Sequence, residues 1–195
     1  AYHEAGHALL GWFSDGSNRV HKVTIIPRGR ALGVTQILPE EDRVSINETE
    51  LKTRLTVDMG GRAAEKLIFD EVTAGGESDL KQATDLARRM VTQWGMSDKI
   101  GPVNFHVGEA QPFLGKDMAE SHHFSEHTAQ IIDSEIARIL REAESEAEEK
   151  LKLYREKLDL LAEALEKDET LEESEIEDLI GPPTYTRKKS EESLP

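Results

Sequence analysis

The chain has 195 residues, of which 37% are hydrophobic, and this is enough for one domain with a core of its own. Its formal net charge of -15 argues against nucleic acid as a partner and against simple attraction to anionic lipid. The sequence contains no cysteine, which excludes disulfide bonds and cysteine-ligated zinc, so a bound metal would need histidine and carboxylate ligands. No stretch has the apolar length of a membrane span and no signal peptide is recognised, so we expect a soluble chain.

The chain begins with the pattern HExxH, formed by His3, Glu4 and His7. On an α-helix, residues four apart lie one above the other on the same face, so the two imidazoles can converge on a single zinc ion. Glu4 is near enough along the helix to act as general base toward a water at the open metal position. The pattern therefore indicates zinc-dependent hydrolysis of peptide bonds.

The same pattern can arise by chance on an amphipathic helix, where the histidines simply belong to a solvated face. The residues that follow argue against this alternative, because they are strongly apolar: Ala8, Leu9, Leu10, Trp12 and Phe13. A helix with such a continuation is buried, and buried histidines need a partner such as a metal ion. We expect the helix to run to about Phe13, where the turn-forming residues 14–18 stop it.

A metal ligand at the third residue of a helix needs a preceding turn to prevent fraying, so we expect an excised fragment whose parent continues upstream. After the first helix, two β-prone runs at 20–27 and 31–38 flank a short glycine-containing turn and predict a hairpin. An edge strand beside a zinc helix could bind an extended substrate through main-chain hydrogen bonds. A hairpin that only covers the core is the alternative.

Helical periodicity predicts a helix over 47–69, with Ser45 and Asn47 as candidate caps. Its buried face is expected to consist of apolar residues at a spacing of four: Leu51, Leu55, Met59, Ala63 and Leu67. Gly60 and Gly61 in its middle each cost about 1 kcal/mol relative to alanine, which suggests a kink or a close helix crossing.

A glycine-containing loop over 70–78 brings Asp79 to the start of a further helix, which Gly95 ends. One face of this helix is expected to hold its apolar residues: Leu80, Ala83, Leu86, Ala87, Met90, Val91 and Trp94.

The zinc site needs a third protein ligand. The extended pattern HExxHxxGxxH is excluded, because Leu10 and Phe13 occupy the positions of its glycine and third histidine. A glutamate soon after the motif is also missing, since the next glutamate is Glu40. Two carboxylates remain, Glu65 and Asp79, although an aspartate in a first helical turn is ordinarily explained by the helix dipole alone. The other histidines are weaker candidates: His21, His106, His122, His123 and His127.

Residues 101–116 are predicted to be mostly loop, with a short strand at 103–107. From Ser125 to Leu165, apolar residues at spacings of three and four predict one or two helices that pack against the domain or a neighbouring subunit. Their glutamate-rich opposite face is expected to be solvated.

A short helix is expected over 173–180, ended by Gly181 and two prolines. The last residues, 181–195, are expected to form a disordered tail. The predicted organisation is thus a zinc peptidase domain at 1–180, with C-terminal helices at about 125–180, followed by this tail.

Taken together, these segments resemble the peptidase domain of the FtsH family, the membrane-anchored AAA+ zinc proteases of bacteria, mitochondria and chloroplasts. The matching segments are AYHEAGHAL at 1–9, GGRAAEKLIF at 60–69, GGESDLKQATDLARRMVTQWGMSDKIGP at 75–102, PFLGKD at 112–117 and KLDLLAEALEKDETL at 157–171. The resemblance covers nearly the whole chain apart from the tail.

The resemblance implies that His3, His7 and Asp79 are the zinc ligands, with one zinc ion per chain, and that Glu4 is the catalytic base. Glu65 is then a group that supports a ligand, or simply part of its helix. The implied fold is mainly α-helical, with a small hairpin or sheet beside the HExxH helix. The implied assembly is a homohexameric peptidase ring under an ATPase ring, which degrades unfolded, damaged or unneeded proteins processively.

The sequence also departs from the whole family protein. It contains no GxxxxGK[ST] phosphate loop, so ATP binding is assigned to an AAA+ ATPase module of the parent. Membrane attachment is likewise assigned to an upstream anchor, with the peptidase on the cytoplasmic side of a bacterial inner membrane or its organellar equivalent. The family's domain also begins somewhat before Ala1.

Two alternative functions remain at this stage. One is a ring-assembly module with a structural zinc site, and the other is a metal-dependent hydrolase of substrates other than peptides. A structural zinc usually has four protein ligands, so three ligands and a positioned glutamate favour catalysis.

Overall fold

The computed structural model describes residues 1–27, 33–38, 46–105 and 124–184. In chain order its elements are α1 (Tyr2–Trp12), β1 (Arg19–Thr24), β2 (Val34–Leu38), α2 (Glu48–Asp58), α3 (Gly60–Phe69), the 3-10 helix η1 (Ala74–Gly76), α4 (Glu77–Thr92), α5 (Glu126–Leu153), α6 (Arg155–Asp168), β3 (Thr170–Glu172) and α7 (Glu173–Ile180). The fold is mainly α-helical with one small sheet, which confirms the predicted fold class.

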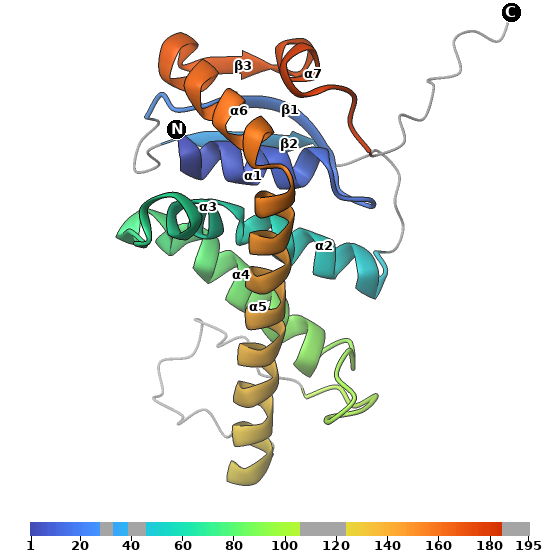
Figure 1. Ribbon diagram of the computed structural model, residues 1–195. Helices are drawn as coiled ribbons and strands as arrows, with labels where there is room; N and C mark the ends of the chain where they lie inside the picture. Colours follow the sequence, from blue (N-terminus) through green and yellow to red (C-terminus); the bar gives the residue numbers. More distant parts are fainter. Residues whose placement is uncertain (28–32, 39–45, 106–123, 185–195) are drawn as a thin grey trace, which may run out of the picture.

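The helix α1, which holds the HExxH pattern, lies in the middle of the molecule. Figure 1 shows it between the sheet on one side and α2 and α3 on the other, with α6 alongside. Every residue from Ala5 to Trp12 is buried, as the apolar continuation of the motif predicts. Burial of apolar surface contributes about 25 cal/mol per Å² to folding, so the helix that carries the motif is also the centre of the core.

The sheet has three antiparallel strands in the order β2-β1-β3. The pairing of β1 with β2 confirms the predicted hairpin, whose connecting residues 28–32 lie outside the described part of the chain. The third strand, β3, was not predicted. Three residues flanked by helices carry no period-2 pattern of their own, and β3 is defined by its pairing with β1, which places Leu171 opposite Val23.

The helix predicted over 47–69 is two helices, so this prediction is wrong in its continuity. Asn47 does cap the first of them, through a capping box with Glu50. The helix is interrupted at Met59, which lies between α2 and α3 just before the glycine pair. A Cβ on Gly6 would lie 2.4 Å from the carbonyl oxygen of Gly60, so these glycines allow α1 and α3 to cross in contact.

The helix α4 carries Asp79 in its first turn, as predicted, but its apolar residues do not all lie on the buried face. Ala83, Ala87, Met90 and Val91 are buried, whereas Leu80 is 43% exposed. Trp94 is 45% exposed and follows the end of the helix. The prediction of a single apolar face was therefore wrong at both ends, where α4 extends past the neighbours that cover its middle.

The long C-terminal helical region consists of two helices, α5 and α6, which meet at Tyr154. The ring of Tyr154 stacks on Phe13 with ring centroids 4.5 Å apart, so the break is held against the end of α1. The predicted short helix at 173–180 is confirmed as α7. No strand is present at 103–105, and the rest of the predicted strand at 103–107 lies outside the described residues.

The first residues of the predicted tail contact the core. The Trp12 ring N–H donates to the carbonyl oxygen of Gly181 (2.8 Å), and the Thr184 N–H donates to that of Trp12 (3.0 Å). Residues 185–195 lie outside the described part of the chain.

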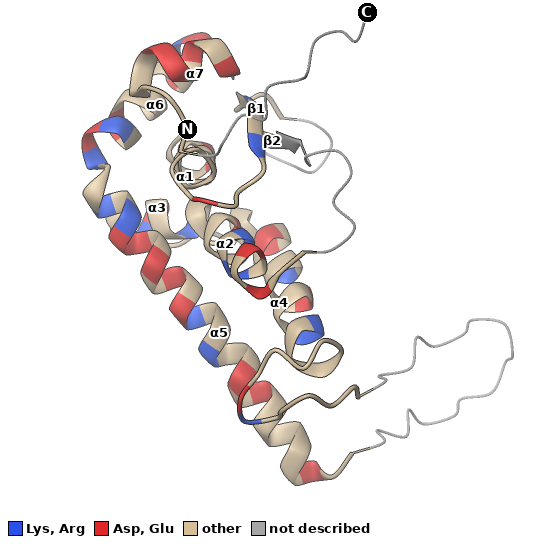
Figure 2. Cartoon of the chain, turned by 90° about the vertical axis from the view of Figure 1, so that its right-hand side faces the viewer, with Lys and Arg blue, Asp and Glu red and all other residues tan. Residues whose placement is uncertain are grey.

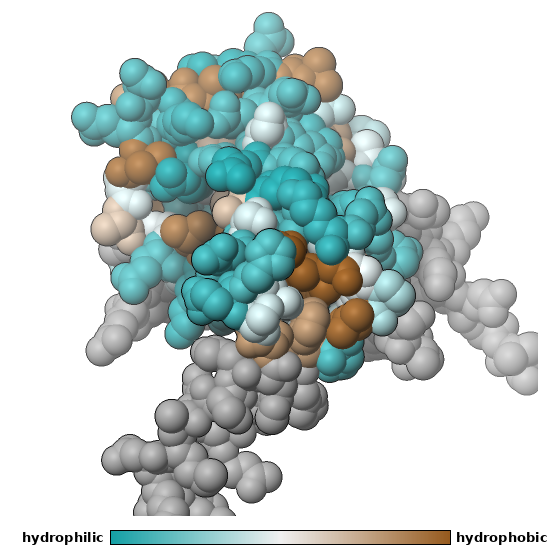
Figure 3. All heavy atoms as spheres, turned by 90° about the horizontal axis from the view of Figure 1, so that it is seen from below, coloured by the Kyte–Doolittle hydropathy of each residue, from teal (hydrophilic) through white to brown (hydrophobic). Residues whose placement is uncertain are grey.

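Charged residues of both signs follow one another along α5, as Figure 2 shows. Two of its glutamates pair with α3, Glu144 with Arg62 (2.8 Å) and Glu148 with Lys66 (2.5 Å). Seen from below, the described surface is largely hydrophilic, with a few hydrophobic patches (Figure 3). None of the described helices has the length and hydropathy of a membrane span.

Candidate metal and catalytic site

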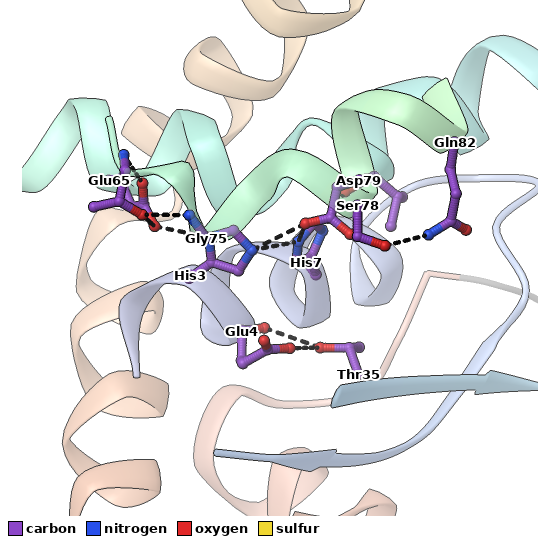
Figure 4. A network of polar contacts seen from close by, with 11 residues as sticks. His3, Glu4, His7, Thr35, Glu65, Gly75, Ser78, Asp79 and Gln82 are labelled. Carbon is purple, nitrogen blue, oxygen red and sulfur yellow. Dashed lines mark hydrogen bonds and ion pairs between the residues drawn. The ribbon is translucent and has the colours of Figure 1, made fainter. Parts of the chain in front are cut away.

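The side chains of His3 and His7 point from α1 toward Asp79 in the first turn of α4 (Figure 4). The Nε2 atoms of the two histidines are 3.2 Å apart. The Asp79 Oδ2 atom lies 3.1 Å from Nε2 of His3 and 3.4 Å from Nε2 of His7. Three potential ligand atoms, from two helices that are far apart in the sequence, therefore form a nearly equilateral triangle.

This triangle has the size of one face of a zinc tetrahedron. With bonds of about 2.0–2.1 Å, two ligand atoms of a tetrahedral zinc ion lie about 3.3–3.4 Å apart. The three observed distances, 3.1, 3.2 and 3.4 Å, agree with this spacing. Within the described residues, this is the one group of three histidine, aspartate or glutamate side chains that could hold a metal ion.

The outer nitrogens of both imidazoles are engaged, and this fixes which nitrogen carries the proton. The Nδ1 atom of His7 lies 2.7 Å from the carbonyl oxygen of Val57, which can only accept, so Nδ1 donates. The Nδ1 atom of His3 likewise donates to Oε1 of Glu65 (2.8 Å). When the two rings are neutral, as metal binding requires, their Nε2 atoms present lone pairs to each other and to the Asp79 carboxylate, an arrangement that a cation between them would stabilise.

Glu65 is buried and has further partners besides His3. Its Oε2 accepts the backbone N–H of Thr73 (2.8 Å), and its Oε1 accepts the Thr73 hydroxyl (3.1 Å). Glu65 thus faces the outer nitrogen of His3, away from the three converging ligand atoms, which agrees with the supporting role.

The charges of the site shift the pKa values of its groups in opposite directions. Burial alone would lower the pKa of His3, but its hydrogen bonds to Asp79 and Glu65, and the nearby charge of Glu4, raise it. Burial would raise the pKa of Asp79, but hydrogen bonds to the two histidines hold it well below its usual range. Burial would also raise the pKa of Glu65, but hydrogen bonds from the Thr73 N–H and from His3 lower it. Both carboxylates are therefore ionised at neutral pH.

Glu4 points from α1 toward β2, where Thr35 contacts it (Figure 4). The Thr35 hydroxyl lies 3.0 Å from Oε2 of Glu4 and can donate to it. A Cβ on Gly33, just before β2, would lie 2.7 Å from the same carboxylate, so glycine at this position leaves it room. The hairpin therefore supplies both the space and a hydrogen bond for the side chain of Glu4.

Two glycines leave room for the His3 ring. A Cβ on Gly61 would lie 2.4 Å from Nε2 of His3, and a Cβ on Gly76 would lie 3.5 Å from its Cε1 atom. The glycine pair that interrupts the helical pattern thus serves both the crossing of α1 with α3 and the approach of α3 to a potential metal ligand.

The structure brings together all four of the predicted site residues: His3, Glu4, His7 and Asp79. The weaker candidates His21 and His127 lie on β1 and α5 and do not belong to the cluster, while His106, His122 and His123 lie outside the described residues. Thr35, Val57 and Thr73 also surround the site, and no sequence pattern predicts them. These residues act through a hydroxyl or a main-chain carbonyl, which no motif marks.

A central helix with HExxH, a carboxylate from a second helix that completes a three-ligand site, and a glutamate held beside it define a metallopeptidase-like domain. The comparison with protein families agrees. The chain matches peptidase family M41 over residues 1–179, and it belongs to this family.

Curated relatives are similar over nearly the whole chain. The ATP-dependent zinc metalloprotease FtsH 1 of Rhodopirellula baltica is 53% identical over 192 residues, which cover 98% of this chain and 29% of the relative. The ATP-dependent zinc metalloprotease FtsH of Nitrosococcus oceani is 55% identical over 180 residues, which cover 92% of this chain and 28% of the relative. The chain thus spans less than a third of the length of these relatives.

Proposed function

We propose that this chain is the zinc metalloendopeptidase domain of an ATP-dependent protease of the FtsH type. The observation that carries the proposal is the convergence of His3, His7 and Asp79, whose potential ligand atoms lie 3.1–3.4 Å from one another. Membership of peptidase family M41 and the printed names of the relatives support the same conclusion.

In this proposal His3 and His7 bind zinc through Nε2, and Asp79 binds it through a carboxylate oxygen. Zinc bound by these residues would supply Lewis-acid chemistry, which lowers the pKa of water and polarises a carbonyl group. Glu4 takes a proton from the attacking water and returns it to the leaving amine. Val57 and Glu65 keep the imidazoles oriented by accepting the protons on their Nδ1 atoms.

The roles that require the rest of the protein belong to the same proposal. The substrates are unfolded or damaged proteins, delivered by an AAA+ ATPase module that lies in the same parent chain but outside these residues. The peptidase domains form a homohexameric ring, and membrane attachment comes from a segment outside this chain. The names of the relatives, which join ATP dependence to zinc proteolysis, support the link to an ATPase module.

The test is the substitution Glu4→Gln in the full chain. It removes the proton acceptor but keeps the size of the side chain and all three metal ligands. We expect cleavage of an unstructured peptide and of casein to fall by at least 100-fold, while the bound zinc remains at the wild-type level. Zinc content is measured by elemental analysis and cleavage by a fluorogenic assay, each with and without a chelator.

Each outcome decides between the possible functions. A Glu4→Gln variant that still cleaves at the wild-type rate would refute the role of Glu4 as base. A wild-type chain that binds zinc but cleaves no peptide would instead support a structural site in a ring-assembly module.

A further inference from the structure

The loop between α3 and α4 brings Asp79 to the metal site, yet its residues bury almost no side chain. Residues 70–75 are exposed, including the large apolar side chain of Val72. Because apolar burial fixes so little of this loop, its position depends on polar contacts with the rest of the domain.

Those contacts are concentrated at Thr73. Its backbone N–H and its hydroxyl donate to the two carboxylate oxygens of Glu65, at 2.8 and 3.1 Å. The same hydroxyl oxygen accepts the N–H of Gly75 (3.2 Å) and thereby caps η1. Both the proton and a lone pair of this hydroxyl are thus used, one toward α3 and one toward the turn that leads into α4.

Glu65 is a fixed anchor for the loop because it is itself buried and bonded to His3. The helix η1 then leads directly into α4, so only the short turn from Thr73 to Asp79 separates the anchor from the third ligand. Gly76 on this turn lies against the His3 ring. A displacement at Thr73 would therefore reach Asp79 with little flexible chain in between to absorb it.

We propose that Thr73 is a positioning residue that holds Asp79 at the metal site through its paired hydrogen bonds to Glu65. The carboxylate of Glu65 then has two tasks, since it orients one zinc ligand directly and places another through the loop. This inference rests on the proposed zinc site and assigns Thr73 to it.

The test measures zinc affinity of the full chain by competition with a chromogenic chelator, which requires no catalytic activity. Thr73→Val removes the hydroxyl while it keeps the backbone N–H and the branched shape. We expect its zinc dissociation constant to rise about 10- to 100-fold, as is usual when a group that orients a ligand is lost. Thr73→Ser, which keeps the hydroxyl, should restore affinity to within about threefold of wild type.

The control is Thr84→Val, which removes a hydroxyl that donates to the Leu80 carbonyl oxygen within α4, away from the loop. It should leave zinc affinity unchanged. A double-mutant cycle with Asp79→Ala asks whether Thr73 acts through Asp79. If it does, Thr73→Val should weaken zinc binding no further in the Asp79→Ala background.

The outcomes separate this inference from the proposed function. A wild-type chain that does not bind zinc would refute both the proposed function and the role of Thr73. Zinc binding by wild type with equal affinity in Thr73→Val would overturn the role of Thr73 alone. If Thr73→Val raises the zinc dissociation constant by the same factor in the Asp79→Ala background, the proposed role of Thr73 is also overturned, because Thr73 would then act through His3 and Glu65. Circular dichroism of each variant checks that the helices are retained.

Discussion

The imidazole of His3 occupies a space that two glycines define. Gly61 faces its Nε2 atom so closely that a Cβ there would lie 2.4 Å away, whereas a Cβ on Gly76 would make an ordinary contact at 3.5 Å. Glycine is therefore required at one position and only tolerated at the other. This difference allows a matched test of the metal site at the scale of single residues.

Gly61→Ala should push the His3 ring away from Asp79 and His7. We expect loss of stoichiometric zinc and a destabilisation of about 1–3 kcal/mol, which is typical of overpacking in a well-packed interior. Gly76→Ala is the control and should retain zinc, because its Cβ fits beside the same ring. Elemental analysis and thermal melts report both effects. Equal zinc content in the two variants would contradict the close contact at Gly61.

At the scale of elements, a buried carboxylate joins α5 to the segment after α4. Glu135 is 1% exposed, although its place among the glutamates of a long helix predicts a solvated side chain. It accepts hydrogen bonds from Arg138 and Ser97 and pairs with Lys99 (2.9 Å). These partners, Arg138 first, lower the pKa of Glu135 to about 2. These bonds therefore fasten the segment after α4 to α5.

This pKa shift predicts a pH dependence of stability. The pKa of Glu135 is lower in the folded state than its ordinary value of 4.5, so its contribution is complete above pH 4.5 and declines as the pH falls toward 2. Between pH 5.5 and 3 we expect the wild-type free energy of unfolding to fall by about 1–2 kcal/mol more than that of Glu135→Gln. Denaturant unfolding at both pH values measures the difference.

The control for this prediction is Glu142→Gln. Glu142 pairs with the same Arg138 but is 60% exposed, so its loss should change stability by less than about 1 kcal/mol. A Glu135→Gln variant with the same pH profile as wild type would contradict the assigned role of Glu135.

At the scale of the whole molecule, the candidate metal site connects elements that are distant in sequence. Its ligands come from α1 and α4, and the groups that orient them come from α2 and α3. Glu4, the proposed base, lies on α1 beside Thr35 of β2. A ligand that binds this site only in the folded state therefore stabilises the contacts between these elements together.

Zinc should consequently raise the melting temperature of the chain. At a free zinc concentration 1,000 times the dissociation constant, linkage gives about 4 kcal/mol, or a Tm higher by about 8–16 °C for a domain of this size. Differential scanning calorimetry with zinc and with a chelator measures the shift, and Asp79→Ala should reduce it. An identical Tm in both conditions would show that no metal binds at this site in the folded chain.

Features of the fold that depend on local sequence pattern can be predicted without the structure. The HExxH spacing, the apolar residues after it and the helical periodicities predicted α1, the hairpin, α7 and the mainly helical class. The pair His3 and His7 follows from helical spacing alone, because a four-residue step returns to the same face. Asp79 did not follow from local pattern, which favoured a dipole role; the family resemblance identified it.

Packing defines the relations between residues far apart in the chain. It brings α1 and α3 together at Gly6 and Gly60, next to the interruption of the predicted helix at Met59, and it pairs β3 with β1. It also placed Thr73, Val57 and Thr35 around the site and buried Glu135. These contacts rest on single hydrogen bonds and on space, for which a sequence has no periodic signal. The histidine pair of the proposed zinc site can thus be recognised from its spacing in the sequence, whereas the groups that orient the two imidazoles are defined by packing.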